Sequence, residues 1–141
     1  MTIKFSIFPD EELMLAKFSG HVSDNELVEE YRKYYESNKG IASFNQLILF
    51  DEATELDLEM ESFIEVSKMA GEYLKNSERS IKTAFVTEKT LHQILSDTYK
   101  SISDAKVPAA SRKTFSNIDA ALQWLEIKSD SSNFVESIKS V

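Results

Sequence analysis

The chain has 141 residues and no cysteine, and its 24 acidic against 16 basic residues give a formal net charge of −8 at pH 7. Hydrophobic residues at 42% and charged residues at 28% are typical of one globular domain and exclude wholesale disorder, disulfides and thiolate chemistry. The acidic balance disfavours nucleic acid and anionic membranes as partners. With neither a signal peptide nor a membrane-length apolar run visible, we expect a cytoplasmic protein without stable membrane insertion.

The first third of the chain is predicted to form a β-hairpin followed by a helix. Residues 3–8 and 13–18 are short β-rich runs separated by a Pro-Asp-Glu-Glu loop, so they should pair antiparallel. Ser23 and Glu26 have the spacing of a capping box, in which each side chain satisfies a free amide at a helix start. The first helix is therefore expected to begin near Asp24.

The middle of the chain predicts a buried strand, an acidic loop and a broad amphipathic helix. Residues 47–50 are all apolar, which is typical of a central strand covered on both faces. The helix is expected over residues 58–74 with Asp57 as its N-cap. Beside its main apolar stripe, a second stripe comprises Val66, Met69 and Tyr73. This breadth indicates either a helix packed between two neighbours or an exposed interaction surface.

The rest of the chain predicts two more units of strand and helix. Residues 81–86 form a strand, and a Thr-x-x-Gln cap at Thr90 begins a helix that runs to about Ile102. A short strand over residues 112–115 is followed by a cap at Ser116-Asn117 and a helix from residue 118 to about residue 127.

The order of these elements, ββαβαβαβα, predicts a single α/β domain over residues 1–127. Right-handed crossovers between parallel strands imply a mostly parallel five-stranded sheet with an antiparallel edge strand and about four helices. Residues 128–141 are expected to be a polar tail, mobile over residues 128–132, in which residues 134–139 could form one more short helix.

The closing segment, residues 112–125 with the sequence RKTFSNIDAALQWL, supports a resemblance to a known family. Together with the opening hairpin, the apolar third strand and the order of elements, it resembles the SpoIIAA-like (STAS-like) bacterial family over most of residues 1–127. The resemblance implies a SpoIIAA-like fold, in which helices follow parallel strands in a right-handed superhelix. Relatives include anti-sigma-factor antagonists, regulatory domains of anion transporters and, more remotely, lipid carriers of the CRAL-TRIO type.

The chain departs from this family at the start of the helix after the third strand. Phosphorylated antagonists carry Asp-Ser-Ser-Gly there, whereas this chain reads Asp57-Leu58-Glu59-Met60. The aspartate is retained, but there is no serine to receive a phosphate. The resemblance therefore implies a protein-binding surface at this place without the phosphorylation switch.

Polar side chains gather in the loops expected at the carboxyl ends of the strands, where open α/β sheets bind ligands. These loops contain His21, Asp51, Glu52, Asp57 and Glu88, a set that could hold a divalent metal. Acids before helix starts are equally expected from capping and the helix dipole, and we favour that interpretation. The sequence has no nucleophile motif and no glycine-rich phosphate loop, so we assign no catalytic residue, metal or cofactor.

We therefore expect a non-enzymatic domain that binds a protein partner or a second copy of itself through the loop and helix after the third strand. The candidate partner-binding residues are Asp51, Glu52, Thr54, Asp57, Glu59, Val66, Met69 and Tyr73. The alternative is a carrier or sensor of a small apolar, lipid-like molecule held between the second and third helices and the sheet. A carrier requires an enclosed apolar cavity, whereas an interaction domain requires a filled core and an exposed patch.

Overall fold

The computed structural model describes residues 3–37, 44–51, 54–57, 59–74, 81–87, 110–127 and 138. In chain order its elements are β1 (Ile3–Phe8), β2 (Leu13–Phe18), β3 (His21–Ser23), α1 (Asp24–Ser37), β4 (Asn45–Phe50), β5 (Glu55–Asp57), α2 (Met60–Leu74), β6 (Ile81–Val86), β7 (Ala110–Phe115) and α4 (Ile118–Trp124). The helix expected over residues 90–102 lies outside the described residues, as does the short one over 134–139 apart from Ile138.

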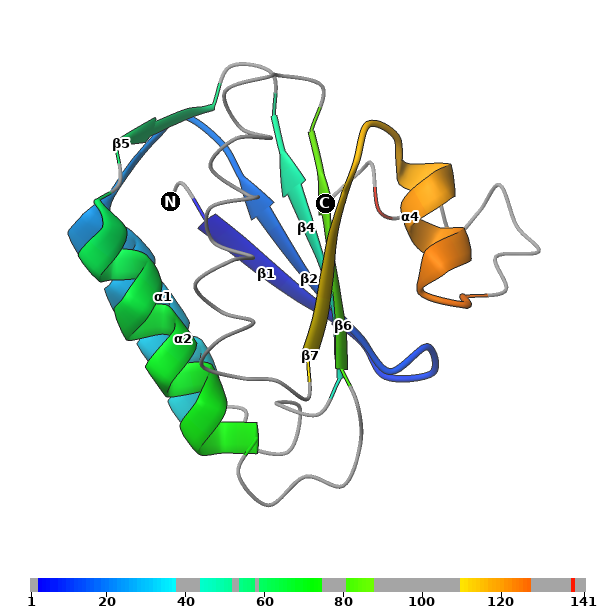
Figure 1. The fold of residues 1–141 in the computed structure, drawn as a ribbon, viewed down its shortest axis with the longest axis horizontal. Coiled ribbons are helices and arrows are strands. Elements are labelled where there is room, and N and C mark those ends of the chain that lie inside the picture. The colour runs from blue at the N-terminus through cyan, green and yellow to red at the C-terminus, as the bar shows by residue number, and fades with distance from the viewer. Residues whose placement is uncertain are drawn as a thin grey trace.

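The main sheet has five strands in the order β1-β2-β4-β6-β7. β1 pairs antiparallel with β2, and every other neighbouring pair in this sheet is parallel. Successive parallel strands are added in one direction, so α1 and α2 lie side by side on the same face, while α4 covers the opposite face (Figure 1). The predicted mixed sheet and α/β class are confirmed.

Both faces of the sheet are covered, which explains the apolar runs in the central strands. In β2, Met14 and Ala16 point toward α1 and α2, whereas Leu13 and Leu15 point toward α4, and all four are buried. β4 repeats this alternation with Ile48 on the helix-pair face. One continuous apolar strand therefore contributes to two separate cores, one on each face.

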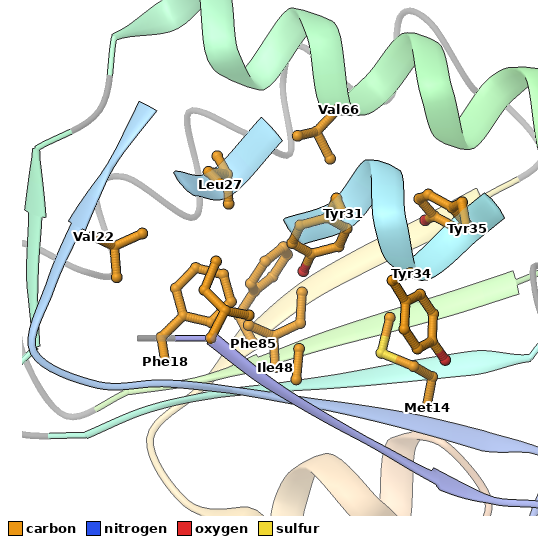
Figure 2. Packing of buried hydrophobic residues seen from close by; sticks show 12 residues of the cluster. Met14, Phe18, Val22, Leu27, Tyr31, Tyr34, Tyr35, Ile48, Val66 and Phe85 are labelled. Carbon is orange, nitrogen blue, oxygen red and sulfur yellow. The ribbon is translucent and has the colours of Figure 1, made fainter. Parts of the chain in front are cut away.

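An aromatic cluster joins α1 to the β1 edge of the sheet. The ring of Phe5 stacks on Tyr34 at 4.4 Å between centroids and meets Tyr31 edge to face at 5.2 Å. Figure 2 shows Tyr31 and Tyr34 reaching from α1 toward the sheet, with Val66 of α2 above them. Burial of Tyr34 raises the pKa of its phenol well above the usual value, because the charged form would lose its hydration.

On the other face, α4 begins and ends with defined contacts. Asn117 has an extended backbone and its Oδ1 accepts a hydrogen bond from the Ala120 amide at 2.8 Å, which confirms the predicted cap. At the other end, Lys82 Nζ donates to the Trp124 carbonyl at 3.0 Å and lies 5.4 Å from the centroid of the Trp124 ring. A cation at a helix C-terminus is favoured by the helix dipole.

The structure adds to the core a residue beyond the domain boundary predicted at residue 127. Ile138 is completely buried and belongs to the same apolar cluster as Leu122 and Leu125 of the α4 region. The domain core therefore includes a residue beyond the predicted boundary. Ile138 lies within residues 134–139, the segment for which the sequence allowed one more short helix.

Candidate interaction site

The loops that follow β2 and β4 are tied together by hydrogen bonds at the carboxyl ends of these parallel strands. The Phe18 carbonyl accepts from the Asp51 amide at 3.0 Å and from Thr54 Oγ1 at 2.9 Å. The Thr54 amide in turn donates to the Asp51 carbonyl at 2.9 Å. Thr54 is 1% exposed, so its predicted role in contacting a partner is wrong, because the hydroxyl anchors the loop to the sheet instead.

Beyond this anchor, the two loops form a small parallel sheet that the sequence did not predict. β3 pairs with β5, and His21 stands opposite Glu55. The Glu55 amide donates a hydrogen bond to the carbonyl of Gly20, the residue before β3, at 2.8 Å. Gly20 adopts a φ of 67°, in the left-handed region that glycine enters at little cost. Val22 of β3 is fully buried and belongs to the same hydrophobic core as the buried residues of α1.

This small sheet brings His21 next to Glu55. His21 Nδ1 lies 3.5 Å from Glu55 Oε2, and both side chains are largely exposed. Asp57 lies two positions further along β5, opposite Ser23. Within the described ranges no three histidine, aspartate or glutamate side chains are grouped closely enough to hold a metal ion.

The first turns of α1 and α2 are linked directly. Asp24 Oδ1 accepts a hydrogen bond from the Glu59 amide at 2.7 Å, so an acid of one helix satisfies a donor at the start of the other. Ser23 Oγ accepts from the Glu26 amide at 3.4 Å, as the predicted capping box requires. Because β5 takes up Asp57, α2 begins at Met60 and the predicted N-cap at Asp57 is wrong.

A groove with a volume of about 410 Å³ lies between α1 and α2. The starts of both helices lie near β5 (Figure 1). The groove is open to solvent. The residues that line it are Asp24, Asn25, Val28, Glu29, Arg32, Glu59, Glu61, Ser62 and Glu65. Carboxylates thus outnumber the single guanidinium five to one, and Val28 contributes an apolar part.

Arg32 bridges the two helices across this groove. Its Nη1 lies 2.6 Å from Glu29 Oε1 on α1, and its Nη2 lies 3.7 Å from Glu65 Oε2 on α2. These pairs are about half exposed, so each adds little to stability. Their geometry nevertheless shows that the groove accepts a guanidinium between carboxylates of both helices.

The structure divides the predicted site residues between the surface and the interior. Asp51 and Glu59 are exposed. Val66 is 3% exposed and packs with α1 residues in the core, which contradicts the predicted exposed patch. Met69 is partly buried against the same core. Glu52 lies outside the described residues, and the structure describes the backbone but not the side chains of Asp57 and Tyr73.

The sequence interpretation missed the α1 half of the groove. The sequence assigned no partner-binding role to Asp24, Glu29 or Arg32, and nothing local relates them to Glu61 and Glu65 on α2. One usable signal existed. Consecutive right-handed crossovers place their helices on one face, so the outward acids of both helices could have been combined into one surface.

The fold defines the class of this protein. A five-stranded mixed sheet with helices on both faces is a SpoIIAA-like α/β domain, as the resemblance implied. The chain is similar in structure to an uncharacterized protein of the DUF3478 family with a SpoIIAA-like fold from Shewanella loihica PV-4, with a TM-score of 0.54 and 20% sequence identity. The similarity covers 87% of this chain and 91% of that chain.

The family itself is identified from the sequence of residues 46–128, which match the model of a domain of unknown function, DUF7793. Since this match spans more than half of the chain, the protein belongs to the DUF7793 family. No curated protein matches it. None of the helices that the structure describes has the length and apolar character needed to cross a membrane.

Proposed function

We propose that this protein is a non-enzymatic cytoplasmic domain that binds a basic segment of a protein partner in the groove between α1 and α2. The observation that carries the proposal is the composition of that groove, which is lined by carboxylates from both helices together with one arginine and Val28. This is the surface after the third strand that the family resemblance implied, extended to include α1.

Electrostatic complementarity explains why a basic partner fits. Five carboxylates converge on an open concave surface, and the net charge of −8 adds a long-range field that attracts cations. Lysine and arginine stems can pack on Val28 while their charged ends meet Glu59, Glu61 or Glu65. Because these groups are exposed, binding should be fast and should weaken as salt rises.

The alternative of an apolar ligand was predicted between the second and third helices and the sheet, and the third of these helices lies outside the described residues. The groove between α1 and α2 offers this alternative little support. A lipid-like molecule requires an enclosed, mostly apolar cavity, whereas this groove is open and lined chiefly by charged side chains. The proposal for an apolar carrier is therefore second, and the experiment below includes a test of it.

The test replaces groove carboxylates by their neutral amides. A triple variant with Glu59→Gln, Glu61→Gln and Glu65→Gln should weaken binding of a fluorescent amphipathic peptide rich in lysine and arginine by on the order of tenfold at low salt, with a smaller difference at physiological salt. Fluorescence anisotropy measures the affinity.

The matched control changes the same total charge outside the groove, with Glu36→Gln, Glu72→Gln and Glu126→Gln, all at exposed positions. If both variants lose affinity equally, net charge and not the groove binds the peptide, and the proposal fails. Affinity capture from the native cytosol with the same three proteins should retain a basic partner on wild type and control only. An organic extract of the purified protein that contains stoichiometric lipid would favour the apolar carrier.

A further inference from the structure

The two edges of the main sheet differ in how they are protected. β7 carries Arg112 and Lys113 in succession, and charged residues on an edge strand discourage pairing with another chain. β1 lies at the other edge and, among the described strands, has a neighbour on one side only. Its sequence, IKFSIF, has a single charge at Lys4. β1 is therefore the edge with the greater capacity to pair.

β1 also carries an exposed apolar side chain. Ile7 is 37% exposed and is the one large hydrophobic residue classed as exposed within the described part of the chain. It lies on the same face as Phe5, because these residues stand opposite Met14 and Ala16 of β2, which point to the α1 side. Phe5 itself is only partly buried. Further burial of this pair would be favourable.

The strand is complementary to a second copy of itself. An antiparallel pair around a two-fold axis perpendicular to the sheet keeps residues of one face together. With the axis at Ser6, Ile7 of each copy stands opposite Phe5 of the other, so the two partly exposed apolar side chains cover each other twice. Lys4 of each copy then stands opposite Phe8 of the other.

Charge supports the same arrangement. The turn after Phe8 carries Asp10 and Glu11, both exposed, and Lys4 at the other end of β1 is exposed as well. Antiparallel pairing brings the start of each β1 to the end of the other, so each Lys4 approaches the acidic turn of the second copy. A parallel arrangement would instead place like charges together.

We propose that two copies of this chain associate through β1, as antiparallel neighbours, and form one sheet that continues across the dimer. The interface uses main-chain groups of β1, the Ile7 and Phe5 side chains, and the contact between Lys4 and the acidic turn. It shares no residue with the groove between α1 and α2, so it is independent of the proposed binding of a basic partner.

A charge placed at the centre of this interface should separate the copies. Ile7→Lys adds a cation twice per dimer at an already exposed position, so the fold should be retained while the dimer dissociates at a concentration higher by on the order of tenfold or more. The matched control is Ser111→Lys, which adds the same charge at an exposed position of β7. Sedimentation equilibrium measures the association, and circular dichroism checks the fold.

Cross-linking tests the register independently of any loss of folding. The chain contains no cysteine, so a single introduced thiol reports on its own surroundings. Opposed residues of an antiparallel pair lie roughly 4.5–5.5 Å apart between Cα atoms, within the range of about 4.4–6.8 Å that a disulfide spans. Ser6→Cys should form a covalent dimer under mild oxidation, whereas Ser111→Cys on β7 should stay monomeric.

Three outcomes would overturn the proposal. Wild-type protein that remains monomeric throughout the concentration range would exclude the dimer. Equal cross-linking of the Ser6→Cys and Ser111→Cys proteins would show random collision. A dimer that survives in the Ile7→Lys protein with unchanged affinity would place the interface elsewhere.

Discussion

Tyr34 is the side chain of α1 whose acid–base behaviour is changed by the packing of this helix on the sheet. Its ring stacks on Phe5, and its hydroxyl is carried into the interior with it. Desolvation raises the pKa of the phenol, with a smaller contribution from Tyr35 nearby. The folded state therefore holds the proton of Tyr34 to higher pH than the unfolded chain does.

This shift predicts a loss of stability in alkali. A group whose pKa is raised in the folded state stabilises it fully below the unfolded pKa, here the ordinary 10.0 of tyrosine, and loses that contribution as pH rises above it. In Tyr34→Phe, the free energy of unfolding should fall less steeply above about pH 10 than in wild type. Urea denaturation from about pH 8 to about pH 11 measures both proteins. Parallel curves would contradict the assignment, because other groups titrate equally in the two proteins.

At the scale of elements, α2 has two different sides. One side faces α1 and the sheet through Val66, with Met69 partly buried beside it. The other carries Glu61, Glu65 and Glu72 into solvent. At Val66 the apolar surface is used in packing against α1 and the core, whereas the exposed acids are available to a partner.

Substitution of Val66 distinguishes these sides. Val66→Ala should lower the free energy of unfolding by roughly 2 kcal/mol, since it removes two buried methyl groups and leaves a cavity, and Val66→Asp should prevent folding. Urea denaturation followed by circular dichroism gives the values. The control is Lys68→Ala, at an exposed position of the same helix, which should change stability by less than about 0.5 kcal/mol. If the Val66→Asp protein folds and its association is altered, Val66 belongs to an exposed patch and not to the core.

At the scale of the whole molecule, the two cores differ in which parts of the chain contribute their buried residues. Among the described residues, the core under α1 and α2 is built from β1 through β6, whereas the core under α4 also includes Ile138 near the end of the chain. A fully buried isoleucine makes many contacts, so this part of the chain contributes to the stability of the entire domain.

Removal of that contact should therefore destabilise the protein globally. Ile138→Ala is expected to cost roughly 2–4 kcal/mol and to lower the midpoint of a single cooperative transition. Differential scanning calorimetry measures the shift. Lys68→Ala provides a control at an exposed position outside the proposed dimer interface, where the loss should be much smaller. Equal losses would show that Ile138 does not belong to the core.

The sequence by itself determined the elements and the class of fold. The alternation and length of apolar runs in β1, β2, β4 and β6, and the caps at Ser23 and Asn117, are local properties that each segment satisfies within a few residues. The order of these segments then implied parallel crossovers, because few topologies are compatible with it. The predicted sheet is confirmed for these reasons.

Only the tertiary structure decided which side chains meet across segments. The pairing of β3 with β5, the burial of Val66 and Thr54, and the return of Ile138 all depend on contacts between residues far apart in the chain. The same holds for the groove, where Arg32 of α1 meets Glu65 of α2. Periodicity shows whether a residue lies on the apolar or the charged face of its own helix or strand. Which residue it contacts on another element depends on how the elements pack together.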